Sequence, residues 1–236
     1  MSYFNLNQNE LSNIIVSVDI KGGLGNQLFQ IFSAYAFATK NNYQLQLLKI
    51  KNNGNRPIYW DSIFKNINHY LVDNLPSNLI KWYESFPTMY KEINNITFPG
   101  IYLDGYLQSS KYFYNDEIKN KIKQLLKPDN ESLFFLKNKY KHLFDNINNI
   151  VVVHARRTDY IKFSNIHGPL NSTYYKNAVS NILNKISNPI FVLTSDDNDF
   201  WNEIKLDVPE LFKHEHHIIE NETDINTFIL FLISSL

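Results

Sequence analysis

The sequence predicts an α/β fold in which parallel strands alternate with helices, and two observations carry this prediction. First, a β-branched apolar run at residues 14–20 ends in a glycine turn, and apolar residues then recur at helical spacing from Asn26 onward. Second, strand-like and helix-like segments alternate regularly from residue 150 to the end of the chain. With 236 residues and 44% hydrophobic content, the chain can bury one large core or two small ones.

The first half of the chain contains three predicted strands, at residues 14–20, 44–48 and 101–107. A helix is expected after the glycine turn, and another from about residue 109 to 126. The segment from 52 to 98 contains several prolines and shows no regular period, so it is predicted to be irregular. Loop-rich inserts of this kind often carry substrate specificity.

The second half begins with a polar helix at about residues 131–143 and a linker-like stretch at 145–149. Predicted strands then alternate with predicted helices. The strands are at 150–153, 190–194 and 217–219, and the helices at 174–186, at about 199–204 and from 225 onward. This alternation favours a parallel sheet with right-handed crossovers.

Composition excludes several classes of function. Lys plus Arg equals Asp plus Glu at 23 each, so net charge gives no reason to expect nucleic acid or an anionic membrane surface. The chain has no cysteine, which excludes disulfides and thiolate metal sites. The N-terminus lacks the pattern of a signal peptide, and the apolar stretch at 228–236 is too short to span a bilayer. We therefore expect a cytoplasmic, soluble protein without a membrane span.

The glycine turn Gly22-Gly23-Leu24-Gly25-Asn26-Gln27 lies between a predicted strand and a predicted helix. Glycines there let the backbone approach a ligand closely, and the free amides at the start of the helix can bind an anion. A tight turn without a ligand would have the same composition. The turn lacks the Lys-Ser/Thr of a Walker loop and the spacing of a dinucleotide fold, which disfavours a dinucleotide-dependent oxidoreductase.

Two adjacent arginines, Arg156 and Arg157, follow the predicted strand at 150–153. Ligands of open α/β sheets bind at the carboxyl ends of the strands, and the guanidinium group matches the oxygens of a phosphate. The arginines could equally be solvated or paired with Asp159. Because successive side chains of a strand point to opposite faces, the two arginines are expected to have different roles.

Two further clusters contain candidate polar residues. Thr194-Ser195-Asp196-Asp197 ends a predicted strand, where the aspartates could contact a ligand, cap the following helix, or do both. The histidines at 214, 216 and 217 match no standard zinc pattern, so no metal site is expected there.

Three strings resemble glycosyltransferase family 11, the α-1,2-fucosyltransferases: GGLGNQLFQ at the glycine turn, HARRTDY at the arginines, and TSDD. The segment GYLQSSKYF at 105–113 fits the same family. The resemblance implies a GT-B-like fold with two Rossmann-like domains facing a cleft. Residues 1–137 would form an acceptor-side domain with the glycine turn, and residues 138–236 a donor domain for the nucleotide-sugar. Family members continue past the last predicted helix, so the second domain is expected to be truncated, and a partner chain could complete the donor site.

The resemblance also implies an activity, which is inverting, metal-independent transfer of L-fucose from GDP-fucose to a glycan hydroxyl, α-1,2 on galactose, without a cofactor. Arg156 would be catalytic, contacting the donor β-phosphate and stabilising the charge that Mg²⁺ stabilises in other enzymes. The other implied donor-binding residues are Gly23, Gly25, Asn26, His154, Asp196 and Asp197. The residues implied to support the site are Gln27, Arg157, Asp159 and Tyr160, with Arg157 bracing the loop against Asp159.

Several alternatives stay open at this point. The donor could be another nucleotide-sugar, or the chain could be a non-catalytic nucleotide-binding or assembly subunit. The acceptor hydroxyl must lose a proton, and Asp104, Asp159 and His167 are all candidates for the general base.

Overall fold

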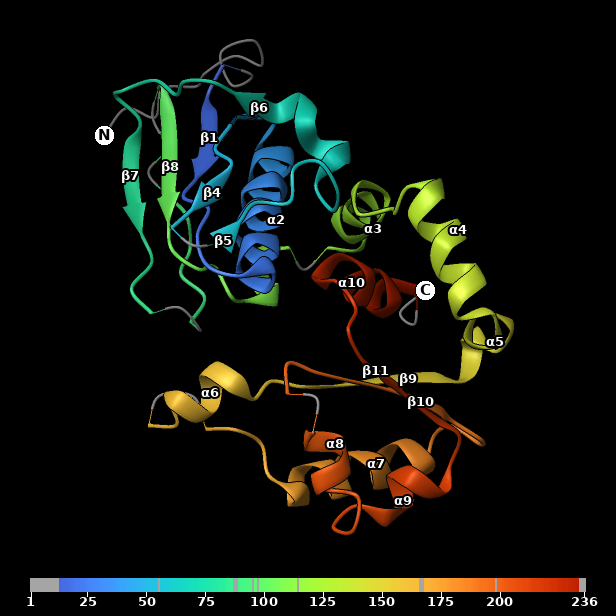
Figure 1. The fold of residues 1–236 in the computed structure, drawn as a ribbon. Coiled ribbons are helices and arrows are strands. Elements are labelled where there is room, and N and C mark those ends of the chain that lie inside the picture. Colours follow the sequence, from blue (N-terminus) through green and yellow to red (C-terminus); the bar gives the residue numbers. More distant parts are fainter. Residues whose placement is uncertain are drawn as a thin grey trace. The chain divides into compact units, whose positions relative to one another are not determined.

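The computed structural model describes residues 13–54, 56–86, 89–94, 96, 98–113, 115–165, 168–197 and 199–233 of the chain. The chain divides into two compact units that meet between Lys127 and Pro128. Each unit has its own parallel sheet with helices packed on it (Figure 1). The predicted α/β class is therefore confirmed, and each unit is described by itself.

The first unit is built on a four-stranded sheet in the order β2-β1-β8-β7, in which every neighbouring pair is parallel. Its strands are β1 (Ile15–Val18), β2 (Gln44–Leu45), β7 (Ile80–Tyr83) and β8 (Gly100–Asp104). In the register of the central pair, Ile15 lies opposite Gly100 and Val18 opposite Leu103. Val16, Ser17 and Val18 are buried, as a continuous β-branched run predicts for a central strand.

Helix α2 (Leu24–Asn41) starts directly after the glycine turn and connects β1 to β2. It packs against β1 and buries an apolar face that includes Ile31, Ala34 and Ala38. The helix ends at Asn42, which adopts the left-handed conformation that asparagine tolerates at a helix terminus. This arrangement places the glycine turn at the carboxyl edge of the sheet.

The segment that the sequence left irregular contains short elements. Strand β3 (Leu47–Leu48) pairs with β6 (Leu71–Val72), and β4 (Asn52–Asn53) forms a hairpin with β5 (Arg56–Pro57). A 3-10 helix, η1 (Lys65–Tyr70), lies between β5 and β6 along the chain. The strand predicted at 44–48 is thus split into β2 and β3, which belong to different sheets. A second 3-10 helix, η2 (Ser110–Tyr112), and α3 (Asp116–Leu125) complete the unit.

The second unit is built on a three-stranded parallel sheet in the order β11-β10-β9. Its strands are β9 (Ile150–Ala155), β10 (Ile190–Ser195) and β11 (His216–Ile219). One face of this sheet packs on α7 (Ser172–Leu183), α8 (Phe200–Glu203) and α9 (Pro209–Lys213), as Figure 1 shows. The core on that face includes Tyr175, Phe191 and Trp201.

The other face of this sheet packs on α4 (Asn130–Lys139), α5 (Lys141–Asp145) and α10 (Asp224–Ile233). Leu136 of α4 is completely buried in the core that Ile229 and Leu230 of α10 help to form. Glu222, just ahead of α10, accepts hydrogen bonds from Lys139 and from the Tyr140 hydroxyl (2.7 Å). These bonds join the start of α10 to the end of α4. Because α4 belongs to this core, the units meet at Lys127 and not at residue 137, where the sequence analysis placed the boundary.

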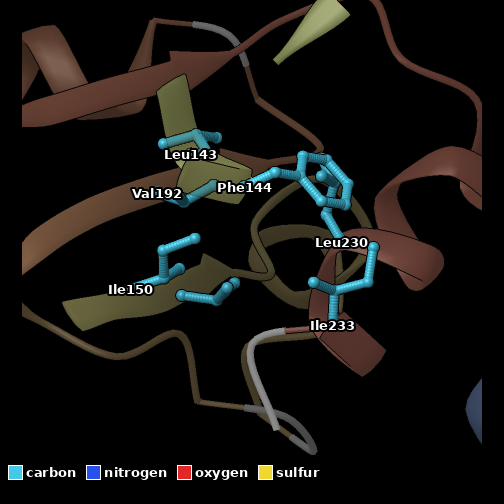
Figure 2. A pocket seen from close by; sticks show the side chains of 7 residues that line it. Leu143, Phe144, Ile150, Val192, Leu230 and Ile233 are labelled. Atoms are coloured by element: carbon cyan, nitrogen blue, oxygen red, sulfur yellow. The ribbon is translucent and has the colours of Figure 1, made fainter. Parts of the chain in front are cut away.

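A small apolar pocket lies beside this second core (Figure 2). Its lining comes from α5, β9, β10 and α10 and consists of Leu143, Phe144, Ile150, Val152, Val192, Leu230 and Ile233. These side chains contain only carbon and hydrogen, so they offer a nucleotide no hydrogen-bonding side chain. Within the described residues, no helix has the length and apolar character that crossing a membrane requires.

Candidate functional site

The polar residues predicted for the second unit gather at the carboxyl ends of β9 and β10. The register pairs His154 with Thr194 and Ala155 with Ser195, so both strands end at the same edge. The chain after β9 carries the arginines, and the chain after β10 carries the aspartates Asp196 and Asp197. The parallel sheet therefore brings together two motifs that lie far apart in the sequence.

Arg156 is held by a bidentate ion pair. Its Nε donates to Oδ1 of Asp159 (2.8 Å) and its Nη2 to Oδ2 (2.5 Å), and Nε also lies 3.4 Å from Oδ2 of Asp196. The Arg156 side chain remains 41% exposed, and its guanidinium carbon lies 6.0 Å from the centre of the Tyr160 ring. The hydrogen bonds with Asp159 raise the pKa of Arg156 and lower the pKa of Asp159. The guanidinium is thus oriented, charged, and still accessible to an anion.

Asp196 ties the end of β10 to the loop after β9. It accepts hydrogen bonds from the amide of Arg157 (2.6 Å) and from the hydroxyl of Thr158 (2.7 Å). Burial by itself would raise the pKa of Asp196, but these hydrogen bonds outweigh it and the pKa is lowered. Asp196 thus binds the start of α6 (Thr158–Lys162), whereas the sequence suggested a cap for the helix that follows β10.

Arg157 occupies a different environment from its neighbour, as strand alternation predicted. Its guanidinium carbon lies 4.4 Å from the centre of the Phe200 ring, and its side chain is only 19% exposed. Its Nε lies 3.9 Å from Oδ2 of Asp197 and is buried without a hydrogen-bond partner among the described residues. Arg157 is therefore braced by Phe200 and Asp197, and not by Asp159 as the sequence analysis expected.

His154 lies near the end of β9, just ahead of the two arginines. Its Nδ1 is 3.0 Å from Oγ1 of Thr194, and its ring packs edge-on against Phe231 of α10. Burial lowers the pKa of His154, so the neutral ring prevails at neutral pH. A neutral imidazole with one nitrogen engaged can offer its other nitrogen to a polar ligand.

The glycine turn of the first unit contains glycines of two kinds. Gly22 has φ +78°, and a Cβ there would lie 2.4 Å from Nδ2 of Asn26, so the turn itself requires glycine. At Gly23 and Gly25, by contrast, an added Cβ would meet no atom within 4 Å. The protein's own packing does not explain glycine at these two positions. Their lack of side chains leaves the space above the start of α2 open.

Glutamine side chains hold the turn in place. Gln27 is buried, and its Nε2 donates to the carbonyls of Gly22 (3.1 Å) and Pro57 (2.8 Å). Asn26 accepts a hydrogen bond from Nε2 of Gln108 (2.6 Å), which belongs to the segment GYLQSSKYF at 105–113. Gln30, which was not among the predicted site residues, is buried and links the amide of Lys21 to the carbonyl of Gly105. A polar residue on the apolar face of a predicted helix was the signal that could have revealed it.

A charged cluster that was not predicted from the sequence lies next to the glycine turn. Nζ of Lys21 lies 3.0 Å from Oδ2 of Asp19 and 2.5 Å from Oδ1 of Asp104. Asp104 was one of the three candidate bases. Of the other two, Asp159 is bound by Arg156 through both oxygens, and His167 lies outside the described residues.

The other histidines form contacts of their own. His217 lies 3.2 Å from His142, measured between Nδ1 and Nε2, and 3.1 Å from Oε1 of Glu215. Across the part of the chain that the structure describes, no three His, Cys, Asp or Glu side chains are grouped so that they could hold a metal ion.

The chain is similar to known glycosyltransferases. A family model described as glycosyl transferase family 11 matches residues 12–230. A protein of Escherichia coli named alpha-1,2-colitosyltransferase is 26% identical over 222 residues, which cover 82% of this chain and 73% of that protein. A crystal structure of NodZ alpha-1,6-fucosyltransferase soaked with GDP-fucose covers 95% of this chain and 82% of its own, with 12% identity and a TM-score of 0.48. The crystal structure of fucosyltransferase NodZ from Bradyrhizobium covers 95% of this chain and 83% of its own, with 12% identity and a TM-score of 0.47.

Proposed function

Because the chain belongs to glycosyltransferase family 11, we propose that it transfers L-fucose from GDP-fucose to a glycan hydroxyl, forming an α-1,2 linkage to galactose. The observation that carries this proposal is the oriented guanidinium of Arg156 at the carboxyl end of a parallel sheet. Ligands of such sheets bind at this edge, and a planar fork of charged donors suits a diphosphate.

Arg156 would act on the leaving group. When the bond between the anomeric carbon and the diphosphate breaks, negative charge develops on the phosphate oxygen. A donor that is already oriented toward this charge stabilises the transition state by about 3–4 kcal/mol. Asp159 and Asp196 hold the guanidinium in place before the donor arrives, so little reorganisation is needed.

Other residues at the carboxyl edge of each unit's sheet would contact a substrate or hold the site in place. In the second unit, we assign His154 and Asp197 to the nucleotide, and Asp196 to the loop that carries Arg156. In the first unit, the open space at Gly23 and Gly25 supports a substrate contact through backbone amides, with Asn26 beside them.

GDP is expected to stabilise the protein much more than guanosine does, because the guanidinium contacts proposed here require the diphosphate. A ligand at about 100 times its dissociation constant adds about 2.7 kcal/mol to the free energy of unfolding. A thermal-shift comparison of GDP, guanosine, GDP-fucose, UDP and dTDP measures this directly. Equal shifts from GDP and guanosine would contradict the role given to Arg156. A larger shift from UDP than from GDP would indicate that the donor is a UDP-sugar.

We also propose that the transfer needs no metal ion, since Arg156 can stabilise the charge of the leaving diphosphate. Turnover is therefore expected to persist in EDTA. The rate of GDP release from GDP-fucose with lactose as acceptor, measured with and without the chelator, tests this. Loss of turnover that only Mn²⁺ or Mg²⁺ restores would refute the arginine mechanism.

A second candidate keeps the chemistry and changes the sugar. The relative from Escherichia coli is named a colitosyltransferase, and colitose differs from fucose by the loss of one hydroxyl. Comparing kcat/KM for GDP-fucose and GDP-colitose on the same acceptor distinguishes the two donors. A preference of more than about tenfold for GDP-colitose would replace fucose in the proposal.

A further inference from the structure

The ring of His154 is held by two contacts from other elements of the second unit. Its Nδ1 lies 3.0 Å from Oγ1 of Thr194, the residue opposite it in the register of β9 and β10. Phe231 of α10 packs edge-on against the ring, with 5.7 Å between the ring centres. His154 remains exposed, and its Nε2 has no hydrogen-bond partner among the described residues. The two contacts therefore fix the ring and leave one nitrogen for a ligand.

The hydroxyl of Thr194 is buried and has two polar neighbours. Thr194 is 3% exposed, and besides Nδ1 of His154 its Oγ1 reaches the carbonyl oxygen of Val153, to which it donates a long hydrogen bond (3.5 Å). A hydroxyl has one proton to donate and lone pairs that accept. It satisfies both neighbours only when it donates to the carbonyl and accepts from an N–H of the imidazole. The opposite arrangement, in which the hydroxyl donates to Nδ1, leaves the contact with Val153 unused.

We infer that Thr194 is a positioning residue that holds His154 in the tautomer protonated at Nδ1, so that Nε2 accepts a hydrogen bond from an N–H or O–H group of the nucleoside. The inference rests on the nucleotide contact proposed above for His154. In a neutral imidazole, the hydrogen bond made by one nitrogen decides which of the two carries the proton. A diphosphate offers oxygen acceptors, so an Nε2 that is itself an acceptor suits the nucleoside and not the diphosphate.

The charges at this edge favour the same division between nucleoside and diphosphate. Partial burial of the ring lowers the pKa of His154, and the charge of Arg156 lowers it further, although Asp196 acts in the opposite direction. A doubly protonated ring, which could donate to a phosphate from Nε2, is thus disfavoured at neutral pH. Arg156 is charged and oriented by Asp159, so it remains the donor for the diphosphate. The two side chains recognise different parts of one nucleotide.

The tautomer of His154 can be measured without any ligand. In long-range proton–nitrogen NMR spectra of protein with labelled histidine, ring nitrogens with and without a proton have well-separated shifts. The signals of His154 are identified by their absence from the His154→Gln variant. In wild-type protein at neutral pH, Nδ1 is expected to carry the proton. A wild-type ring protonated at Nε2 would overturn the inference, whatever the variants below do.

Binding measurements test the role of the hydroxyl. Thr194→Val removes it and keeps the branched shape, so GDP is expected to bind about three- to tenfold more weakly, which is the effect of one neutral hydrogen bond. Affinity for inorganic pyrophosphate should change by less than about twofold, because Arg156 is intact. Thr194→Ser keeps a hydroxyl and should bind GDP within about twofold of wild type. Thr173→Val, the same substitution at an exposed position of α7, is the matched control and should bind both ligands as wild type does.

Two analogues of GDP locate the group that Nε2 recognises. The compound 2′,3′-dideoxy-GDP lacks both ribose hydroxyls, and purine riboside diphosphate lacks the N–H donors of guanine. For the analogue without the recognised group, wild type and Thr194→Val are expected to bind equally, since the contact is absent from both complexes. If Thr194→Val weakens both analogues as much as it weakens GDP, Nε2 does not bind the nucleoside and the inference is wrong.

Three other results separate this inference from the proposed function. Unchanged GDP affinity in Thr194→Val would overturn the inference. Equal losses for GDP and pyrophosphate would show that Thr194 only supports the edge of the sheet, and would overturn it as well. Wild-type protein that is stabilised equally by GDP and guanosine would instead refute the role of Arg156 and the proposed function. The tautomer measurement stands apart from that outcome because it uses neither nucleotide nor turnover.

Discussion

Replacing Arg156 with lysine is expected to lower turnover by on the order of a hundredfold or more while the second unit stays folded. Lysine keeps the positive charge but loses the planar fork, so it cannot bind Asp159 through two bonds and a phosphate at the same time. The exposed position of Arg156 makes a large loss of stability unexpected. Steady-state kinetics with GDP-fucose, together with circular dichroism, measure both effects. GDP affinity provides a second readout of the same contact.

Arg157→Lys is the matched control for this prediction. Arg157 packs on Phe200 in the core of the second unit, so its loss should mainly lower the free energy of unfolding, by about 1 kcal/mol. Its effect on turnover should be much smaller than that of Arg156→Lys. The opposite pattern, in which Arg157 is the sensitive position, would show that the wrong arginine has been placed at the phosphate.

Replacing Gly100 with alanine is expected to destabilise the first unit by about 3 kcal/mol or more. Gly100 has φ +146°, a conformation that side chains rarely adopt, and its Cβ would lie 2.0 Å from the carbonyl oxygen of Ile15. Because the two residues face each other in the β1–β8 pair, the central strands would have to separate. Urea unfolding, followed by circular dichroism, measures the change.

Gly25→Ala is the matched control for Gly100→Ala. Gly25 lies in the first turn of α2, and an added Cβ would meet no atom within 4 Å. Alanine favours the helix by about 0.5–1 kcal/mol, so this variant should be as stable as wild type or more stable. Similar losses at both glycines would mean that close approach to β1 is not what makes Gly100 necessary.

Strands with a continuous apolar run could be predicted from the sequence, whether central or at an edge of the sheet, and a strand without such a run could not. β1 and β10 are central and β9 is an edge strand, yet all three are continuous β-branched or apolar runs, which are typical of parallel strands. β7 was missed because three of its four residues are exposed, so no hydrophobic pattern marks it. Its place in the sheet depends on pairing with β8, which local sequence does not reveal.

Helix breaks inside a long periodic pattern were also missed. The helix predicted from 109 to 126 is two elements, because the side chain of Asn115 accepts the amides of Glu117 and Ile118 and begins a new helix. The helix predicted at 131–143 is likewise divided between α4 and α5 at Tyr140. In both cases apolar spacing alone could not show the interruption.

Candidate site residues could be predicted where they are neighbours in the sequence, but their partners could not. His154, Arg156 and Asp159 share one motif, whereas Phe200, which stacks on Arg157, comes from a helix beyond β10. The pairing of Lys21 with Asp104 likewise depends on the register of β1 and β8. Contacts of this kind follow from the folded sheet and not from the local pattern.

The placement of α4 in the second core bears on how genes of this family can recombine. A crossover that joined this second unit to a different first unit would keep both cores intact only if it fell near Lys127. A junction at residue 137 would remove Leu136 from its contacts with Ile229 and Leu230 and leave a void in the core. Viable mosaic proteins should therefore carry their junctions ahead of Asn130, so that α4 is inherited with the sheet it covers.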